Sequence, residues 1–181
     1  MLEAGQNIIT RHLPKTGQTA SYFPEDDGEF ELGWWRGRLN ANNKNRWLQK
    51  TIGGDDIVVD RATGLMWPAD CTAAGGNMGA AIGTWTGAIV FAVALNFAGF
   101  TDWRLPNIYE LFCILDYGSA PGWHQPPFAN VINDHYWSST TYPPITFFAM
   151  ILQFVNYRVW TISKTLPGVN VYALAVRDAA I

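Results

Sequence analysis

Hydrophobic and polar positions divide the chain into a turn-rich first third and a more apolar remainder. Residues 1–56 are polar, and only short apolar pieces such as Trp34-Trp35 interrupt them. We therefore expect loops that wrap a core, with one short strand near Asn7–Arg11. The stretch Ile57–Trp67 is different, because the turn residues Asp60–Gly64 separate two apolar segments. This pattern predicts a β-hairpin.

Two apolar segments have the features of helices. Residues 69–83 are small and glycine-rich, which indicates a loop, and a helix is expected over 84–98. Thr84 or Thr86 would cap this helix, and Gly99 would end it. Its residues are apolar on every face, which predicts that it is buried.

The second helix is expected over residues 108–117. Asn107 and Glu110 have the spacing of a capping box, in which each side chain accepts a hydrogen bond from the other residue's backbone. The apolar residues that follow recur at helical spacing and define one core-facing side, and Gly118 ends the segment. These residues are Ile108, Leu111, Phe112 and Leu115.

After a proline-containing loop over 119–134, the pattern becomes that of strands. We expect strands at Tyr136–Thr140, Phe147–Phe154, Arg158–Ser163 and Val169–Arg177, with a two-residue turn at Asn156-Tyr157. The fold class is therefore α+β, with two helices packed on a small, mostly antiparallel sheet and with long loops. The length of 181 residues suits a single domain over 1–181, with 1–56 as an N-terminal wrap and 135–178 as the C-terminal strands.

The C-terminal strands are apolar on both of their faces. If Leu152, Phe154 and Val159 point inward, the period of two places the intervening residues outward. Those outward residues are Ile151, Gln153, Arg158 and Trp160. A sheet buried on both sides explains this pattern, and so does an exposed aromatic patch that binds a ligand.

Composition narrows the classes of function. Aromatic residues make up 14% of the chain and charged residues only 15%, so there is more aromatic surface than one small core needs to hide. The net charge of −3 provides no basic footprint for nucleic acid. The longest apolar run, Ala88–Leu95, is too short to cross a bilayer, and Met1–Thr10 has no signal-peptide pattern. We expect no nucleic-acid partner and no membrane insertion.

Candidate chemistry is sparse. The three histidines are isolated in the sequence, and Cys71 and Cys113 form no metal or redox motif, so we expect no catalytic residues, cofactor or metal. A buried thiol is the expectation for Cys113. The acidic cluster at 25–31 is expected to be a solvated loop rather than a calcium site. Asp102 and Arg104 are expected to form ion pairs or hydrogen bonds that hold the start of the second helix.

Five segments together resemble one protein family. They are Leu13–Thr19, Asp60–Trp67, Ala98–Leu111, Tyr136–Thr140 and Ala175–Arg177. In this order they resemble the C-terminal domain family of the Legionella collagen-like protein, over about Leu13 to Arg177. The resemblance implies a C-type lectin-like fold, in which Asp102, Trp103, Arg104, Asn107 and Glu110 would be structural.

The same resemblance implies binding rather than catalysis. Formylglycine-generating enzymes are similar at the Arg-Leu-Pro segment, but they need catalytic cysteines in their C-terminal part. In this sequence no cysteine follows Cys113. The Glu-Pro-Asn loop of calcium-dependent lectins is also absent. Some proteins of this fold are variable proteins of diversity-generating retroelements, whose C-terminal segment is mutated and binds ligands.

We therefore expect a ligand- or receptor-binding protein, an adhesin displayed on a virion, phage or cell surface, with a protein or glycan as its unknown partner. Oligomers are compatible with an exposed apolar face. A calcium-independent carbohydrate-binding adhesin, with Trp123 and Trp160 stacking on sugars, is the alternative, and an enzyme related to the formylglycine-generating family is a remote one. The predicted binding residues are Tyr142, Thr146, Phe147, Phe148, Met150, Asn156, Tyr157, Arg158, Trp160 and Ile162.

Overall fold

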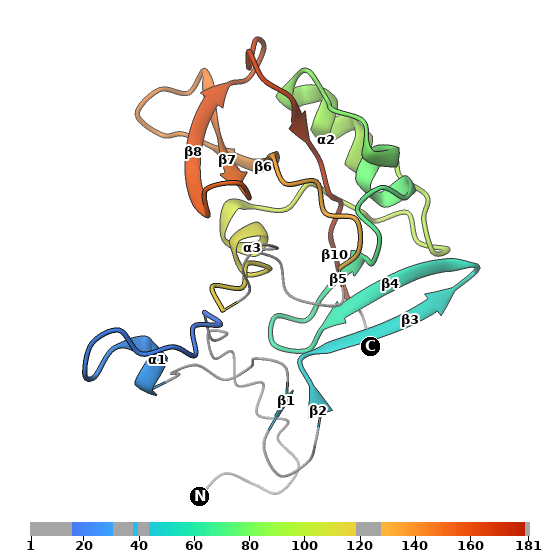
Figure 1. The fold of residues 1–181 in the computed structure, drawn as a ribbon. Coiled ribbons are helices and arrows are strands. Elements are labelled where there is room, and N and C mark those ends of the chain that lie inside the picture. The colour runs from blue at the N-terminus through green and yellow to red at the C-terminus, as the bar shows by residue number, and fades with distance from the viewer. Residues whose placement is uncertain (1–15, 31–37, 40–43, 119–127, 180–181) are drawn as a thin grey trace, which may run out of the picture.

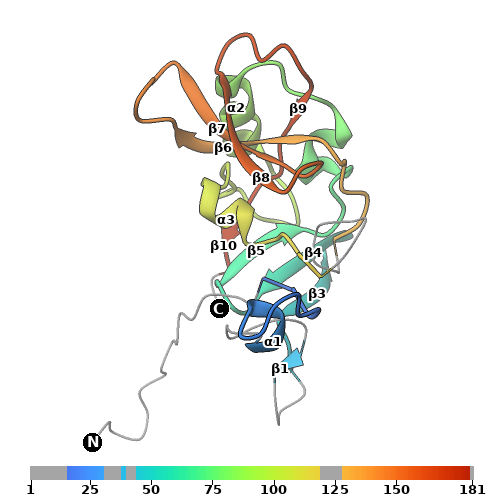
Figure 2. The same ribbon diagram turned by 60° about the vertical axis from the view of Figure 1, so that its left-hand side comes forward.

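The computed structural model describes residues 16–30, 38–39, 44–118 and 128–179 (Figure 1). Its main elements are two four-stranded sheets, and helix α3 (Ile108–Phe112) lies between them in both views (Figures 1 and 2). This mixture of helices and sheets confirms the α+β class. The expectation of one small sheet was wrong, because the hairpin near the start of the chain and the C-terminal strands build separate sheets.

The first sheet contains the predicted hairpin. It has the order β10-β5-β4-β3, and all of its pairs are antiparallel. The hairpin strands are β4 (Asp55–Asp60) and β5 (Leu65–Pro68), while β10 (Arg177–Asp178) pairs with β5. Strand β3 (Trp47–Ile52) lies in the segment that was expected to be loop. The hydrophobic pattern did not predict this strand, since a strand on the sheet edge needs little apolar content and only Trp47 of β3 is buried.

The second sheet has the order β8-β7-β6-β9. Its strands are β6 (His135–Thr141), β7 (Phe148–Gln153), β8 (Arg158–Ser163) and β9 (Val171–Tyr172), and β9 runs parallel to β6. The first three strands occupy the predicted places within one residue at each end. The expected strand Val169–Arg177 is instead divided, because its two ends join different sheets as β9 and β10.

The turn between β7 and β8 is longer than expected. Strand β7 ends at Gln153 and β8 begins at Arg158, so four residues connect them rather than Asn156 and Tyr157 alone. Tyr157 has a φ of 54°, in the left-handed region that glycine would adopt more readily. A longer loop therefore replaces the tight two-residue turn, which would favour glycine at this point.

The remaining elements are short. Helix α1 covers Asp27–Phe30, β1 (Arg38–Leu39) pairs with β2 (Lys44–Asn45), and the 3-10 helix η1 (Ala74–Gly79) lies in the expected glycine-rich loop. The strand expected near Asn7–Arg11 lies outside the described residues.

Helix α2 (Trp85–Ala94) begins as predicted and ends early. The Thr84 side chain accepts a hydrogen bond from the Gly87 amide, which confirms Thr84 as the cap. The helix ends before Leu95 rather than at Gly99. The prediction that this helix is buried on every face was wrong. Only Ala88 and Ala92 are fully buried, and residues on other faces, including Val90, are exposed.

Helix α3 is shorter than predicted. It ends at Phe112, and the chain turns at Cys113 instead of continuing to residue 117. Ile108, Leu111 and Leu115 are buried as expected, whereas Phe112 is exposed. Over the part of the chain that the structure describes there are three α-helices and one 3-10 helix, and only α2 has seven or more residues, so the two-helix expectation was wrong.

Two clusters of buried side chains form the core. The first cluster joins β4 and β5 to the second sheet, for example through Val58, Trp67 and Leu152. The second cluster contains Ile57, Trp103 and Ile151. Adjacent β7 residues belong to different clusters, so this strand is buried on both faces. Ile151 is consequently buried, and its predicted outward position was wrong.

The lengths of the helices limit whether any of them could cross a membrane. No helix within the described ranges is both long and apolar enough to cross a bilayer.

Candidate ligand-binding surface

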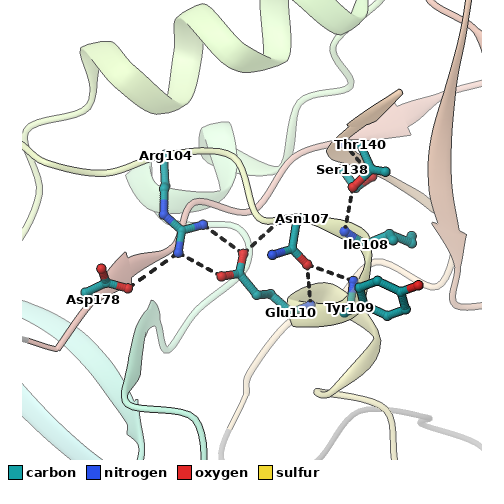
Figure 3. Close-up of polar contacts among 8 residues, drawn as sticks. All are labelled: Arg104, Asn107, Ile108, Tyr109, Glu110, Ser138, Thr140 and Asp178. Carbon is teal, nitrogen blue, oxygen red and sulfur yellow. Dashed lines mark hydrogen bonds and ion pairs between the residues drawn. The ribbon is translucent and has the colours of Figure 1, made fainter. Parts of the chain in front are cut away.

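Two of the segments that carry the family resemblance, Ala98–Leu111 and Tyr136–Thr140, meet around the start of α3 (Figure 3). The Asn107 side chain accepts hydrogen bonds from the amides of Tyr109 and Glu110, and Glu110 accepts one from the Asn107 amide. The predicted capping box is therefore present. Glu110 also accepts two hydrogen bonds from Arg104, at 2.7 and 2.8 Å, and this contact raises the pKa of the guanidinium.

The capped helix is tied directly to the second sheet. The Ile108 amide donates to the Thr140 hydroxyl of β6, and the Ser139 amide donates to the carbonyl oxygen of Pro106. Ser138 continues the link, because its hydroxyl donates to the carbonyl oxygen of Met150 on β7. The Arg-Leu-Pro-Asn segment and the Tyr-Trp-Ser-Ser-Thr strand therefore form one hydrogen-bonded joint beneath the C-terminal strands.

Asp102 and Arg104 are both anchors, but they do not pair with each other. Asp102 accepts two hydrogen bonds from Arg177, whose side chain is buried and lies over the Phe100 ring. These bonds hold the pKa of the Asp102 carboxyl below its usual value. Trp103 is buried and donates to the carbonyl oxygen of Phe97.

None of the ten predicted binding residues is fully buried. They fall into three groups around the β7–β8 pair. Tyr142, Thr146 and Phe147 lie in the loop between β6 and β7, and Asn156 and Tyr157 lie at the opposite end of the strands. The remaining five are on the strands themselves: Phe148, Met150, Arg158, Trp160 and Ile162.

The strand residues do not share one face. The register pairs Ile151 with Trp160 and Gln153 with Arg158, so Arg158, Trp160 and Ile162 lie on the face of the second core cluster. Phe148 and Met150 lie on the other face, where Met150 packs against the first cluster. The structure therefore separates two of the predicted residues from the other three.

Arg158 and Trp160 form the most organised exposed pair in this group. The guanidinium carbon of Arg158 lies 4.5 Å from the centre of the Trp160 ring, and Trp160 is 49% exposed. The Arg158 Nε donates to Gln153 Oε1 at 2.6 Å, which helps to hold the guanidinium over the ring. A cation over an aromatic face is a favourable arrangement, and Arg158 remains exposed to solvent.

A polar row supports Arg158 from beneath. Gln153 is buried, and its Nε2 lies 2.6 Å from His135 Nε2 on the neighbouring strand. His135 Nδ1 in turn contacts the Asp134 carboxylate. Because Gln153 Oε1 accepts from Arg158, its amide group donates to His135, whose Nε2 must accept and whose Nδ1 carries the proton. The row therefore fixes both the orientation of Gln153 and the position of Arg158.

An aromatic cluster forms the turn end of the strands. The ring of Tyr157 lies 5.8 Å from that of Tyr117, which is 6.3 Å from Phe112. The Tyr117 hydroxyl donates to the carbonyl oxygen of Tyr157. Burial raises the pKa of the Tyr157 phenol to about 12. Tyr157 is thus fixed by its neighbours, while the adjacent Asn156 is exposed.

The opposite end carries exposed apolar side chains. Phe147 is 54% exposed, and Ile145 in the same loop is also exposed. Backbone hydrogen bonds close this loop, because the Tyr142 amide donates to the carbonyl of Phe148 and the Phe148 amide to that of Ile145. The loop therefore presents Phe147 on an ordered backbone.

The free cysteines and the acidic side chains are the remaining groups with possible reactive or metal-binding roles. Cys71 is a buried free thiol whose pKa burial raises to about 12, and burial also raises the pKa of the partly buried Cys113 thiol. Among residues that the structure describes, no three histidine, cysteine or acidic side chains converge on a possible metal position. Asp26 instead accepts backbone hydrogen bonds, the largest effect coming from Tyr22, and these lower its pKa. Glu31 and Trp123 lie outside the described residues.

The residues beneath Arg158 were not predicted from the sequence. Gln153 was placed on the same face as Arg158 by its period of two, but neither His135 nor Asp134 was connected with it. Only the register of β6 against β7 brings His135 opposite Gln153. A histidine that begins one strand and a glutamine that ends its neighbour would have been the available signal.

Comparison with known proteins identifies one family. The model of the Lcl C-terminal domain family matches residues 56–177, which is more than half of the chain. The match begins within β4 and ends at Arg177 in β10, so it includes the joint around α3 and the whole second sheet. No curated protein sequence matches the chain.

Proposed function

Since this chain belongs to the Lcl C-terminal domain family, we propose that it is a non-enzymatic ligand-binding domain with a C-type lectin-like fold. The binding surface would be centred on Arg158 and Trp160 and would extend to Ile162 and the Phe147 loop. In this proposal the protein is an adhesin at the surface of a virion or cell, and its C-terminal segment is diversified by a retroelement.

The stacked pair of Arg158 and Trp160 is the observation that supports this proposal. Arginine and tryptophan are enriched among residues that dominate binding energy, because they combine large contact area with directional hydrogen bonds. Here Gln153 fixes the arginine before any ligand arrives. A side chain that is already ordered loses little conformational entropy on binding, so more of its contact energy appears as affinity.

The exposed ring of Trp160 also favours the second candidate, calcium-independent carbohydrate binding. An indole face is apolar and planar, and the CH groups of a sugar ring can pack on it. The neighbouring guanidinium would then donate to sugar oxygens. A glycan ligand and a protein ligand would use the same two side chains, so binding measurements must separate them.

The test is a parallel screen of the protein against a glycan array and a displayed random-peptide library. Every ligand recovered is measured again with Arg158→Ala and Trp160→Ala. We expect each substitution to weaken binding about 10- to 30-fold, as for residues at the centre of an interface. Val90→Ala is the matched control, because Val90 is an exposed apolar residue on α2. Ligands that bind both variants as well as they bind the original protein would contradict the proposal.

Diversification has a separate test at the level of the gene. A reverse-transcriptase gene nearby, together with a near-copy of the 3′ coding segment, would support it. Sequencing of a population should then show adenine-specific changes in the codons of the predicted binding residues and unchanged codons for Asn107 and Glu110. If the coding segment is invariant and no reverse-transcriptase gene lies nearby, diversification is wrong, but the proposed binding function is not affected.

A further inference from the structure

The hydrogen-bond row beneath Arg158 has a fixed direction. Arginine nitrogens only donate, so the Arg158 Nε must meet the oxygen of the Gln153 amide. The Gln153 nitrogen then faces His135 Nε2, 2.6 Å away, and this ring nitrogen has to accept. The other ring nitrogen, Nδ1, contacts the Asp134 carboxylate and carries the proton. The row is therefore complete only while the His135 ring is neutral.

A second proton on His135 would break this row. Both ring nitrogens of an imidazolium are donors, so Nε2 would no longer accept from the Gln153 nitrogen. If the Gln153 amide turns over, its oxygen accepts from His135, but its nitrogen then faces the Arg158 Nε, which is also a donor. Either orientation of the amide therefore leaves two donors opposed at one end of Gln153.

Burial decides which of the two contacts is lost. Gln153 is 6% exposed and the His135 side chain 16% exposed, so breaking the bond between them would leave polar groups away from water. Arg158 is exposed and can replace the Gln153 oxygen with water at little cost. We therefore expect the Gln153 amide to turn toward the imidazolium, and the Arg158 Nε to lose its partner.

Two charged groups face His135 along the row. Asp134, which precedes it in the chain, contacts Nδ1 and forms the one ion pair of His135 among the described residues. Arg158 approaches from β8 and is separated from the ring by the Gln153 amide. A proton on His135 thus places a positive charge between a carboxylate that attracts it and a guanidinium that it repels. This repulsion adds to the loss of the Arg158 contact.

The remaining neighbours of His135 are uncharged or face away from it. Strand β9 places Val171 opposite His135, and the carbonyl oxygen of Val171 accepts a hydrogen bond from the segment before α2. That segment and α2 lie within residues 72–101, which contain no titratable side chain. Tyr136 and Tyr172 pack in the first core cluster, on the opposite face of the sheet. Histidine is the side chain whose charge changes between pH 8 and pH 5, so His135 links pH to the row.

We propose that His135 is a positioning residue of the binding surface. The neutral ring orients Gln153 so that Arg158 is held over Trp160, and protonation of the ring releases Arg158. The surface would then bind its ligand at neutral pH and release it in mild acid. The effect on binding rests on the proposed function, whereas the release of Arg158 is a property of the protein without a ligand.

The release is measured first on the intact protein alone. The NMR signal of the Arg158 Nε–H group is identified by its loss in Arg158→Lys and is followed from pH 8 to pH 5. We expect its chemical shift to move to that of a solvated arginine, with the same midpoint as the His135 ring signals. A signal that stays constant over this range would overturn the inference and leave the proposed function unaffected.

Two variants separate positioning from a merely structural role. In His135→Gln, a neutral amide oxygen that does not titrate can replace Nε2, so Arg158 should keep its pH 8 signal down to pH 5. In Gln153→Glu, a carboxylate accepts from both the imidazolium and Arg158, so the release should also disappear. Circular dichroism checks that each variant folds, and either one is sufficient. Release that persists in a folded variant would contradict the proposed mechanism.

Binding is measured next, with each glycan or peptide recovered by the parallel screen. We expect at least about threefold weaker binding at pH 5 than at pH 8, because the released arginine has to be ordered again. The ratio measured with His135→Gln corrects for other titrating groups and should be close to one. If Arg158 is released but affinity does not change with pH, His135 does not position the surface. If Trp160→Ala leaves every ligand bound, the proposed function fails instead, although Arg158 is still released in the free protein.

Discussion

Asp60 forms an ion pair with Arg46, a residue that the hydrophobic pattern did not identify. The two side chains form a bidentate ion pair at 2.8 and 2.7 Å, and both are almost completely buried. Asp60 also accepts hydrogen bonds from the Ala62 amide and the Thr63 hydroxyl, which hold the hairpin turn between β4 and β5. One carboxylate thus stabilises a local turn and neutralises a cation that comes from outside the hairpin.

We predict that Asp60→Asn lowers the free energy of unfolding by about 3 kcal/mol, because it leaves the buried Arg46 charge uncompensated. Urea denaturation followed by circular dichroism measures this change. Asp56→Asn is the matched control on the same strand, and since Asp56 is exposed its effect should stay within about 0.5 kcal/mol. Equal effects of the two substitutions would contradict a special role for the buried pair.

Asp102 should make stability depend on acid pH. Its folded-state pKa is lowered, first by the hydrogen bonds from Arg177, from an ordinary value of 3.8. The stabilisation is therefore present above about pH 3.8 and is lost as the pH falls through the lower folded value.

For the same reason, Asp102→Asn should destabilise the protein at pH 7 and make no difference once Asp102 of the original protein is protonated. Because the Asp102 side chain is 62% exposed, we expect about 1 kcal/mol or less. Thermal unfolding of both proteins between pH 7 and pH 2.5 measures the effect. A difference in melting temperature that persists unchanged to the lowest pH would refute this coupling.

Residues were predictable from sequence where their partners are local. The capping box of Asn107 and Glu110 depends on a spacing of three, so the pattern alone was sufficient. The partner of Asp102 lies 75 residues away, and Asp102 was instead considered together with its neighbour Arg104. The polar row beneath Arg158 likewise depends on strand register, which composition and periodicity do not determine.

Among the elements, α3 is the one whose stability depends most on its ends. It has only five residues, so few intrahelical hydrogen bonds can form and the cap satisfies a large share of the helix amides. The same cap supports Arg104 and the contact to Thr140 on β6. Loss of the cap should therefore also weaken the hydrogen-bonded joint between α3 and the second sheet.

Asn107→Ala should cost about 1 kcal/mol of stability, the usual value for removing a capping side chain. Chemical denaturation gives this number directly. Asn96→Ala is the control, because Asn96 is an exposed asparagine in the loop after α2. A loss no greater than that of the control would show that α3 is held by tertiary packing alone.

The errors in element prediction have a common physical cause. Helix α2 was judged from its apolar composition, yet only Ala88 and Ala92 are fully buried, because the helix packs on the second sheet with one face and leaves the other exposed (Figure 2). Strand β3 was missed because a strand at a sheet edge can be mostly polar. The segment 169–177 was predicted as one strand because most of its residues are apolar, although the segment crosses from one sheet to the other.

At the scale of the molecule, the first core cluster connects both sheets. It includes Val58 and Trp67 of the first sheet, Leu152 of the second, and the buried thiol Cys71. A core that is shared in this way should couple the two sheets, so that neither can unfold while the other keeps its buried surface. Aromatic residues contribute to this core as well as to the exposed surface around Trp160, which explains how a chain with few charges uses its aromatic excess.

Cys71 offers a way to test that coupling, because its thiol is neutral and buried in the native state. In a Cys113→Ser background, a thiol reagent should label Cys71 only as the protein unfolds. Leu152→Ala removes buried side-chain volume from the other sheet and should cost about 2–5 kcal/mol. If the two sheets unfold together, Leu152→Ala must shift the urea midpoint of Cys71 labelling as far as it shifts the midpoint measured by circular dichroism.

Val155→Ala is the control, because Val155 is exposed, and it should shift neither midpoint. If Leu152→Ala moved the circular dichroism transition while Cys71 stayed protected, the sheets would unfold separately, and substitutions in the binding strands could then be tolerated without loss of the first sheet.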